Sequence, residues 1–248
     1  MHHTCAYGAT VASAAETDIA AIADQVLVIQ NGHFLPQRPT NILYAAFCAL
    51  LGVRARLSSP TLAVITSPYI RDISLAVDFG NPQIIADYSQ DQLMLAPLEE
   101  LTLFATNSAA TSGLSLGILG LDYGRQPQPA GNIYTIRGTA TATLVINAWT
   151  QLGTITWQNS LPTGTYAIVG AEAFSAGGKA FRITCENQVP RPGGLATLLE
   201  TNRTHPIFRM GNLGEWGRFH NYAMPTFEMI SASADTAESV YLDLVKVG

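Results

Sequence analysis

One short motif in the sequence holds residue types that could perform nucleophilic catalysis. Gly113 to Gly117 reads G-L-S-L-G and matches the G-x-S-x-G pattern, with Ser115 as the nucleophile. The pattern works where a strand turns sharply into a helix, whereas Ile118 to Leu121 predicts more strand. His205 and His220 are the candidate bases, and neither lies in a recognisable catalytic context. We therefore expect no enzyme; the enzyme alternative predicts a pocket that holds Ser115 beside a histidine.

The histidines give no pattern for binding a metal ion. They form neither an H-E-x-x-H motif nor a paired metal-ligand spacing. The sequence predicts that the first two belong to a solvated tail, and it predicts no metal and no cofactor. The five histidines are His2, His3, His33, His205 and His220.

Aromatic residues gather in the second half of the chain and give the best case for a binding function. A carbohydrate-binding or adhesin module uses exposed, coplanar rings as stacking platforms, and it would be the alternative function for these residues. Packing between two sheets is the simpler interpretation, because aromatic side chains supply much of the buried area of a core. The candidate stacking residues of the alternative are Trp149, Trp157 and Trp216.

The chain has few charged residues for its length. Only 12% of its 248 residues are charged and 48% are apolar, whereas about a quarter of residues are charged in ordinary domains. We interpret this as a surface covered by other subunits, because obligate interfaces are depleted in charge. A neutral polar surface on a monomer is the alternative. The net charge of -5 argues against sequence-specific nucleic-acid binding.

Cysteine usage and hydropathy exclude two further classes. Cys5, Cys48 and Cys185 are odd in number without metal-like spacing, so we predict no disulfide framework. The latter two lie in apolar runs and are expected in the core. The N-terminus lacks the features of a secretory signal. No apolar run reaches the roughly 18 residues of a membrane-spanning helix.

Strand and turn signals alternate along most of the chain, at the spacing of roughly 8 to 12 residues typical of sandwiches and barrels. The clearest case is Leu161 to Ile183, which predicts a β-hairpin around Gly177-Gly178. Further strands are predicted at 141–147 and 206–209. The one helix signal is Ser13 to Asp24, where Ser13 is a candidate N-cap with Glu16 three residues later.

The order of these signals occurs twice, which predicts two similar halves of roughly 100 to 120 residues each. The fold class is therefore predicted as all-β, with two tandem eight-stranded antiparallel jelly-roll-like domains and a short N-terminal helical arm. The matching pairs are 44–57 with 166–183, 68–71 with 206–209, and 103–109 with 227–234. The predicted division is an arm at 1–24, a first domain at 25–124, a proline-rich linker at 125–131 and a second domain at 132–248.

With this organisation the chain resembles the double jelly-roll major capsid proteins of tailless icosahedral viruses and phages. The repeated segments 44–57 with 166–183 and 103–109 with 227–234 carry the resemblance, which is architectural and covers nearly the whole chain after Gln25. It implies a structural virion protein that assembles as homotrimers into an icosahedral shell. Its partners would be further copies, other virion proteins and an internal membrane reached through the N-terminal arm. A minor virion protein, such as a spike or vertex protein, is the neighbouring alternative.

Overall fold

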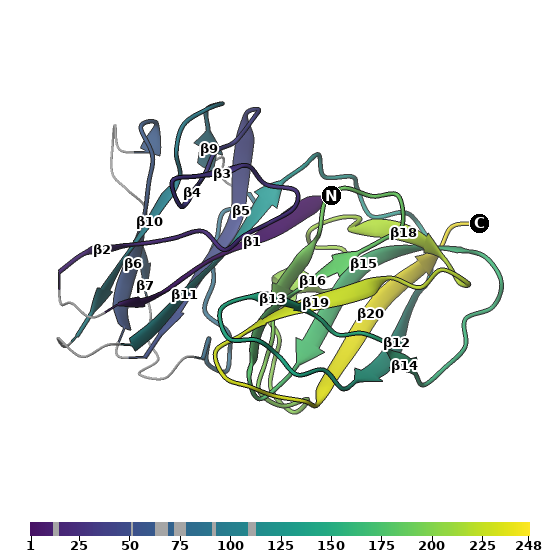
Figure 1. Cartoon of the computed structure of the whole chain (residues 1–248). Coiled ribbons are helices and arrows are strands. Elements are labelled where there is room, and N and C mark those ends of the chain that lie inside the picture. The colour runs from purple at the N-terminus through teal and green to yellow at the C-terminus, as the bar shows by residue number, and fades with distance from the viewer. Residues whose placement is uncertain (12–14, 51, 63–68, 72–77, 91–92, 109–112) are drawn as a thin grey trace. The chain divides into compact units, whose positions relative to one another are not determined.

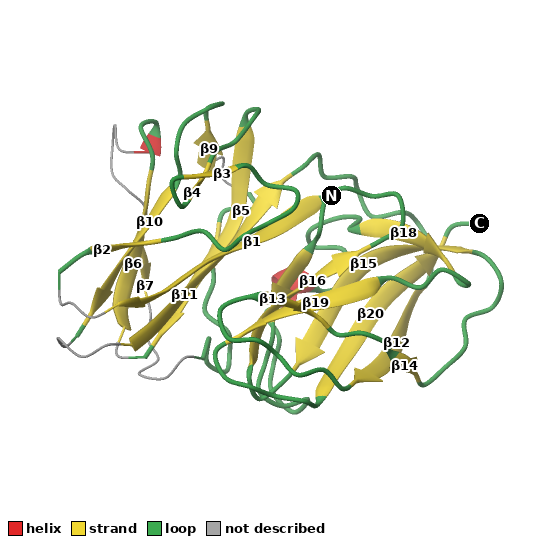
Figure 2. Ribbon diagram, viewed as in Figure 1, coloured by secondary structure: helices red, strands yellow, loops and turns green. Residues whose placement is uncertain are grey.

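The structure is a computed structural model of the chain (Figure 1). It describes residues 1–11, 15–50, 52–62, 69–71, 78–90, 93–108 and 113–248. Strands and loops make up nearly all of these residues, and helix is confined to short turns such as η2 (Pro206–Phe208) (Figure 2). The all-β prediction is confirmed. Within the described ranges, no helix has the length and apolar character needed to cross a membrane.

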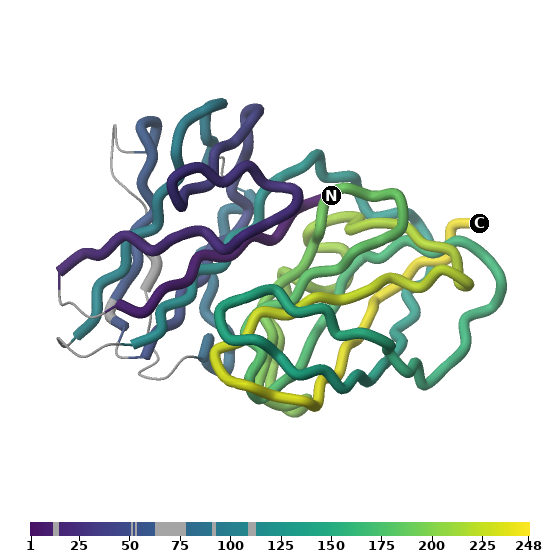
Figure 3. The backbone as a smooth tube through the Cα atoms, viewed as in Figure 1, coloured from purple at the N-terminus to yellow at the C-terminus, as the bar shows by residue number. Residues whose placement is uncertain are grey.

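The chain divides into two compact units, which are described separately below. The first unit contains Cys5–Gly80 and Ile84–Asp122, and the second contains Met1–Thr4, Asn81–Gln83 and Tyr123–Gly248. The backbone trace can be followed from one unit to the other by residue number in Figure 3. The second unit thus includes two short segments from the first half of the sequence, and no sequence signal had indicated either of them.

The first unit contains two main antiparallel sheets. One has the order β1-β11-β5-β8, with β9 also paired to β5, and the other has the order β2-β10-β6-β7. A small β3-β4 ribbon is added to these. The strands are β1 (His2–Val11), β2 (Thr17–Ile19), β3 (Ile29–Gln30), β4 (His33–Phe34), β5 (Thr40–Ala49), β6 (Gly52–Ser58), β7 (Tyr69–Arg71), β8 (Ala86–Asp87), β9 (Leu93–Leu95), β10 (Thr102–Asn107) and β11 (Gly113–Asp122).

The second unit also contains two antiparallel sheets. Their orders are β14-β12-β20-β15-β18 and β13-β19-β16-β17. The strands are β12 (Ile133–Ala140), β13 (Trp149–Gln151), β14 (Thr156–Trp157), β15 (Thr165–Phe174), β16 (Gly178–Thr184), β17 (Gly193–Leu195), β18 (Gly217–His220), β19 (Thr226–Ser231) and β20 (Glu238–Lys246).

Both units pass their strands between the two sheets in the same order. In the first unit, β1, β2, β5 and β6 lie alternately in the first and the second sheet. The next strand, β7, is in the same sheet as β6, and β8, β10 and β11 then alternate again. In the second unit β12, β13, β15, β16, β17, β18, β19 and β20 repeat the path. Two sheets filled in this way by eight strands form a jelly roll. Both units have this order, but the predicted count of eight strands does not hold, because β9 and β14 bring the described sheets of each unit to nine strands.

The core of the first unit lies around β5 and β11, which are buried along most of their length. Tyr44 is fully buried and lies opposite Gly120, where an added Cβ would come within 2.0 Å of the tyrosine ring. The alanine-rich segment Tyr44 to Ala49 therefore forms a strand, because the close pairing of β5 with β11 requires small residues. Cys48, like Cys5 and Cys185, is buried, as the sequence predicted for Cys48 and Cys185.

The predicted helix at 13–24 is wrong over the residues that the structure describes, and Ser13 lies outside them. Ile19 in β2 pairs with Leu103 of β10, and both side chains are fully buried. Beyond the strand, the Ile22 amide donates a 2.8 Å hydrogen bond to the Ala6 carbonyl. Pairing across the sheet satisfies the backbone and buries the apolar face, which outweighs the helix propensity of the alanines.

The predicted hairpin at 161–183 is also wrong, because β15 and β16 belong to different sheets. The turn between them is a corner held by Asp235. Its carboxylate accepts hydrogen bonds from the Ser175 hydroxyl at 2.6 Å and from the Gly177 amide at 3.1 Å. The Ser175 hydroxyl in turn accepts from the Gly178 amide at 2.8 Å.

Asp235→Ala is expected to destabilise the second unit by about 1 to 3 kcal/mol, because it removes the acceptor that fixes this corner. Hydrogen bonds lower the pKa of Asp235 against the opposing effect of burial, so the contribution is present above the ordinary aspartate pKa and is lost as the pH falls through the lowered one. Urea denaturation measures the change in the free energy of unfolding. Thr236→Ala, at the exposed neighbouring position, is the control. Equal effects of the two substitutions would contradict the role of the carboxylate.

Two predicted strands of the second half are replaced by other structure. Residues 206–209 contain η2, in which Pro206 lacks an amide hydrogen and the His205 ring accepts a 3.3 Å hydrogen bond from the Ile207 amide. Residues 141–147 contain only an isolated bridge between Ile146 and Ser231. The proposed match of 68–71 with 206–209 therefore fails, since β17 holds the place in the second unit that β7 holds in the first.

Candidate functional site

The three candidate tryptophans do not form a shared exposed platform. Trp216 is fully buried, with the His2 ring 4.7 Å and the Phe181 ring 6.4 Å from it, centroid to centroid. Trp149 is half-buried, and the Arg182 guanidinium lies 4.3 Å from the centre of its ring. Trp157 is half-buried in β14. In this structure Trp216 has no face open to a sugar, and Arg182 occupies a face of Trp149.

The catalytic motif is part of a regular strand. Ser115 is fully buried in β11 and lies in register with Ala49 of β5. The strand continues to Asp122 without the sharp turn that lifts a nucleophile into solvent. His205 caps η2, and His220 ends β18. Among the described residues, the buried Ser115 hydroxyl has no hydrogen-bond partner.

The first two histidines are not a solvated tail, contrary to the prediction. His2 is fully buried, and its Nε2 lies 2.9 Å from the carbonyl oxygen and 3.1 Å from the amide nitrogen of Gly193. His3 is also buried, and its Nδ1 accepts a 3.0 Å hydrogen bond from the Arg191 amide. The Thr4 amide donates a 2.9 Å hydrogen bond to the Arg191 carbonyl. The chain start is thus packed onto residues 191–193, at the beginning of β17, inside the second unit.

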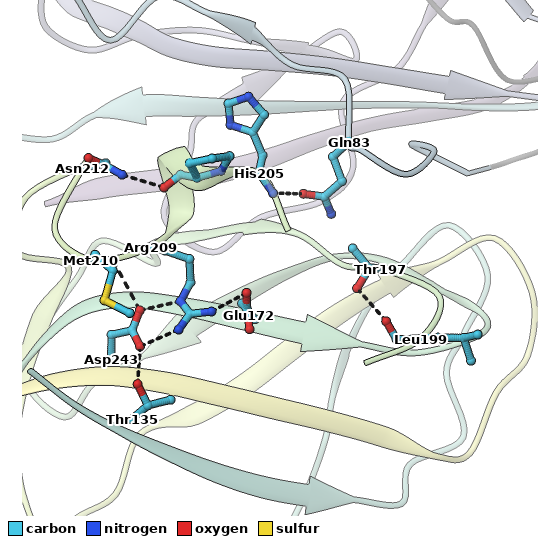
Figure 4. A network of polar contacts seen from close by, with 11 residues as sticks. Gln83, Thr135, Glu172, Thr197, Leu199, His205, Arg209, Met210, Asn212 and Asp243 are labelled. Carbon is cyan, nitrogen blue, oxygen red and sulfur yellow. Dashed lines mark hydrogen bonds and ion pairs between the residues drawn. The ribbon is translucent and has the colours of Figure 1, made fainter. Parts of the chain in front are cut away.

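A buried ionic cluster lies on the sheet of β12, β20 and β15 (Figure 4). Asp243 of β20 is fully buried and accepts from Arg209 through Nε at 2.5 Å and Nη2 at 2.9 Å. The same carboxylate accepts from the Thr135 hydroxyl at 2.8 Å and the Met210 amide at 3.3 Å. Arg209 also pairs with Glu172 of β15. These contacts attach the segment after η2 to three strands of the sheet.

The neighbouring backbone is shaped to admit this cluster. The pairing of β15 with β20 shifts register between Ile168 and Gly170. A Cβ at Gly170 would lie 2.8 Å from the Phe208 carbonyl oxygen and 2.9 Å from Asp243 Oδ2. The missing side chain therefore lets the segment 208–210 approach the sheet closely enough to form the ion pairs.

The short segment 81–83 docks beside η2 in the same unit. The buried Gln83 side chain accepts a 2.9 Å hydrogen bond from the His205 amide (Figure 4). Asn81 accepts a 3.0 Å hydrogen bond from the Arg203 amide. Both contacts use backbone donors of an irregular stretch, which explains why no residue pattern predicted them.

A second cluster lies on the opposite sheet of this unit. Arg182 of β16 is almost fully buried and donates to Glu228 of β19 at 2.6 Å, while Arg191 donates to the same oxygen at 2.9 Å. In the described part of the chain, at least six arginines form ion pairs with carboxylates of their own unit, so that much of the small charge of this chain is used inside the units. They are Arg56, Arg137, Arg182, Arg191, Arg209 and Arg218.

Several apolar side chains of the second unit are exposed at its surface. Val145 and Ile146 are consecutive and 54% and 53% exposed. Their loop is fixed, because the Ser231 hydroxyl donates a 2.9 Å hydrogen bond to the Val145 carbonyl and the Asn147 amide donates a 3.0 Å bond to the Ser231 carbonyl. A fixed loop with two exposed apolar residues suits contact with another protein. Further exposed apolar residues of the second unit are Tyr134, Val189, Leu198, Leu199, Met210 and Tyr222.

The comparisons with known proteins gave two solved structures. No family model and no curated protein matches the sequence. The chain is similar to the crystal structure of the major capsid protein P2 from bacteriophage PM2, at 12% identity and a TM-score of 0.27, over 100% of this chain and 98% of that one. It is similar to the crystal structure of the STIV major capsid protein, at 10% identity and a TM-score of 0.29, over 97% of both chains. The jelly-roll description of the two units rests on the strand order of this chain.

Proposed function

We propose that this chain is a structural virion protein, the major subunit of an icosahedral capsid, and that it acts by assembly and not as an enzyme. One observation carries the proposal: the jelly-roll strand order occurs twice in a single short chain. Two similar units on one chain allow three chains to present six similar sides. A homotrimer of this kind can tile a closed shell through repeated contacts.

The distribution of charge supports burial of the surface against further copies. Only 12% of the residues are charged, and six arginines already have carboxylate partners inside their units. A surface with few free charges costs little to desolvate when subunits associate. The partners that we propose are copies of the same chain and other virion proteins. A net charge of -5 does not favour direct packing of nucleic acid.

We propose no membrane contact through an N-terminal helical arm. The described part of that arm contains the strands β1 and β2, and its first four residues belong to the second unit. Backbone and side chains that pair inside a sheet are not available to insert into a lipid surface.

The mass and shape of the purified chain in solution test the proposal. Light scattering combined with negative-stain imaging is expected to find trimers with a six-sided outline, or closed shells. A monomer that persists at high protein concentration would contradict the proposal, because a major capsid protein must self-associate.

A double substitution probes the surface used. Val145→Asp with Ile146→Asp is expected to raise the concentration needed for assembly at least about tenfold, since each buried aliphatic side chain contributes roughly 1.5 to 3 kcal/mol. Thr141→Asp with Thr143→Asp adds the same charge at exposed positions before this loop and is the matched control. An unchanged assembly threshold for the first variant would exclude this loop from the contact.

A further inference from the structure

A small cavity on the second unit combines an exposed aromatic ring with polar side chains. It has a volume of about 230 Å³ and lies beside β18 and the turn that follows β16. Its lining includes Tyr222, His220, Arg218, Glu186 and Asn187. Pockets that bury a drug-sized ligand hold about 300 to 1,000 Å³, so this cavity fits a ligand of about one ring.

Tyr222 is held as a platform on one wall of the cavity. At 81% exposed, it is the most exposed large apolar residue in the described part of the chain. One side of its ring lies against His220, with centroids 3.9 Å apart and planes tilted by 32°. The Ala223 amide donates a 2.8 Å hydrogen bond to the His220 carbonyl and closes the turn. A fixed tyrosine ring gives a large contact area at little entropic cost.

The polar wall is fixed as well. Arg218 is 52% exposed at its side chain and donates to both oxygens of Glu215, at 2.8 and 2.9 Å. Gln188 donates a 3.3 Å hydrogen bond to the Arg218 carbonyl, which ties the turn after β16 to β18. In that turn Glu186 and Asn187 are both exposed. A guanidinium, a carboxylate and an amide supply the donors and acceptors that adjacent hydroxyl groups require.

We propose that this cavity binds one neutral pyranose sugar. The apolar face of the sugar ring stacks on Tyr222, and its hydroxyl groups bond to the polar wall. The charge of Arg218 is balanced by Glu215, which leaves Glu186 as the remaining charge of the lining and disfavours an acidic sugar. The site contains none of the three tryptophans first considered for sugar stacking, and it adds a ligand-binding activity to the structural function proposed above.

Saturation-transfer NMR on the full chain tests the site, with the methyl glycosides of glucose, galactose and mannose as neutral probes and that of glucuronic acid as the acidic probe. We expect at least one neutral glycoside to bind in roughly the millimolar range. Tyr222→Ala is expected to weaken that binding at least about tenfold, while Tyr222→Phe retains it because the ring remains. Tyr134→Ala, a half-exposed tyrosine of β12, is the control and leaves binding unchanged.

Three outcomes would overturn the proposal. They are the absence of binding by every neutral glycoside, binding of the acidic glycoside alone, and equal binding by the Tyr222→Ala variant and the unmodified chain. Each can be separated from the capsid proposal, because the mass of the chain in solution is measured independently of its sugar binding.

Discussion

Replacing Asp243 by alanine is expected to lower the free energy of unfolding of the second unit by about 3 to 5 kcal/mol. The substitution removes the acceptor for Arg209, Thr135 and the Met210 amide at once. Arg209 then keeps its ion pair with Glu172 but loses the one with the buried carboxylate. Removing one member of a buried ion pair costs more than the pair contributes, because the remaining charge stays desolvated.

Urea denaturation followed by tryptophan fluorescence measures this effect selectively, since all three tryptophans of the sequence lie in the second unit. Arg209→Ala and the double substitution complete a thermodynamic cycle. The double variant should be less destabilised than the sum of the two single variants, because it leaves neither charge buried alone. Glu186→Ala removes an exposed carboxylate of the same unit and is expected to stay within about 0.5 kcal/mol of the unmodified chain. A similarly small change for Asp243→Ala would show that the cluster does not hold the unit together.

The sequence could predict which segments are equivalent in the two halves. The matches of 44–57 with 166–183 and of 103–109 with 227–234 align β5 and β6 with β15 and β16, and β10 with β19, which hold the same places in their sheets. Apolar alternation and turn residues determine where a strand lies and which face it buries. For this reason the pattern was visible in both halves despite the lack of a shared motif.

The pattern could not predict which strand pairs with which. The turn between β15 and β16 has the glycines of a hairpin, but it joins two sheets through Asp235, which is 60 residues away from Ser175. In the same way, Ile19 has a helical spacing to its neighbours and is buried by pairing with β10. Local periodicity contains no information on contacts between residues so far apart in the sequence. These contacts determine which strands pair and which segments become strands.

One residue of the buried polar cluster is conspicuous in the sequence. Asp243 interrupts the run Val240 to Val245, whose other residues are aliphatic or aromatic. A carboxylate at a core position of a strand requires a partner. That partner is Arg209, which is 34 residues earlier in the chain. No local spacing of residues in the sequence could identify it. Tyr222 was visible as an aromatic residue, but only the fold brings Glu186 and Asn187 to it.

Acidification is expected to release the first four residues from the second unit. Burial lowers the pKa of His2 to about 3, against the hydrogen bond with Gly193 that raises it, and the Met1 ammonium, His3 and Arg125 lower it further. Above the ordinary histidine pKa of about 6.5, the His2 ring is neutral whether the first four residues are docked or released. In that pH range His2 therefore makes docking no more and no less stable as the pH changes. Below that value the released chain binds a proton that the docked ring does not. Docking therefore weakens by about 1.4 kcal/mol per pH unit down to the lowered pKa.

His2→Gln removes the titrating ring while keeping a polar group near Gly193, so its docking is expected to be insensitive to pH over this interval. Amide exchange at Thr4, whose amide bonds to the Arg191 carbonyl, reports the docked state once the intrinsic pH dependence of exchange is subtracted. Protection in the unmodified chain should fall by about a factor of ten per pH unit below roughly pH 6, and protection in the variant should stay level. Parallel curves for the two proteins would mean that another group governs the docking.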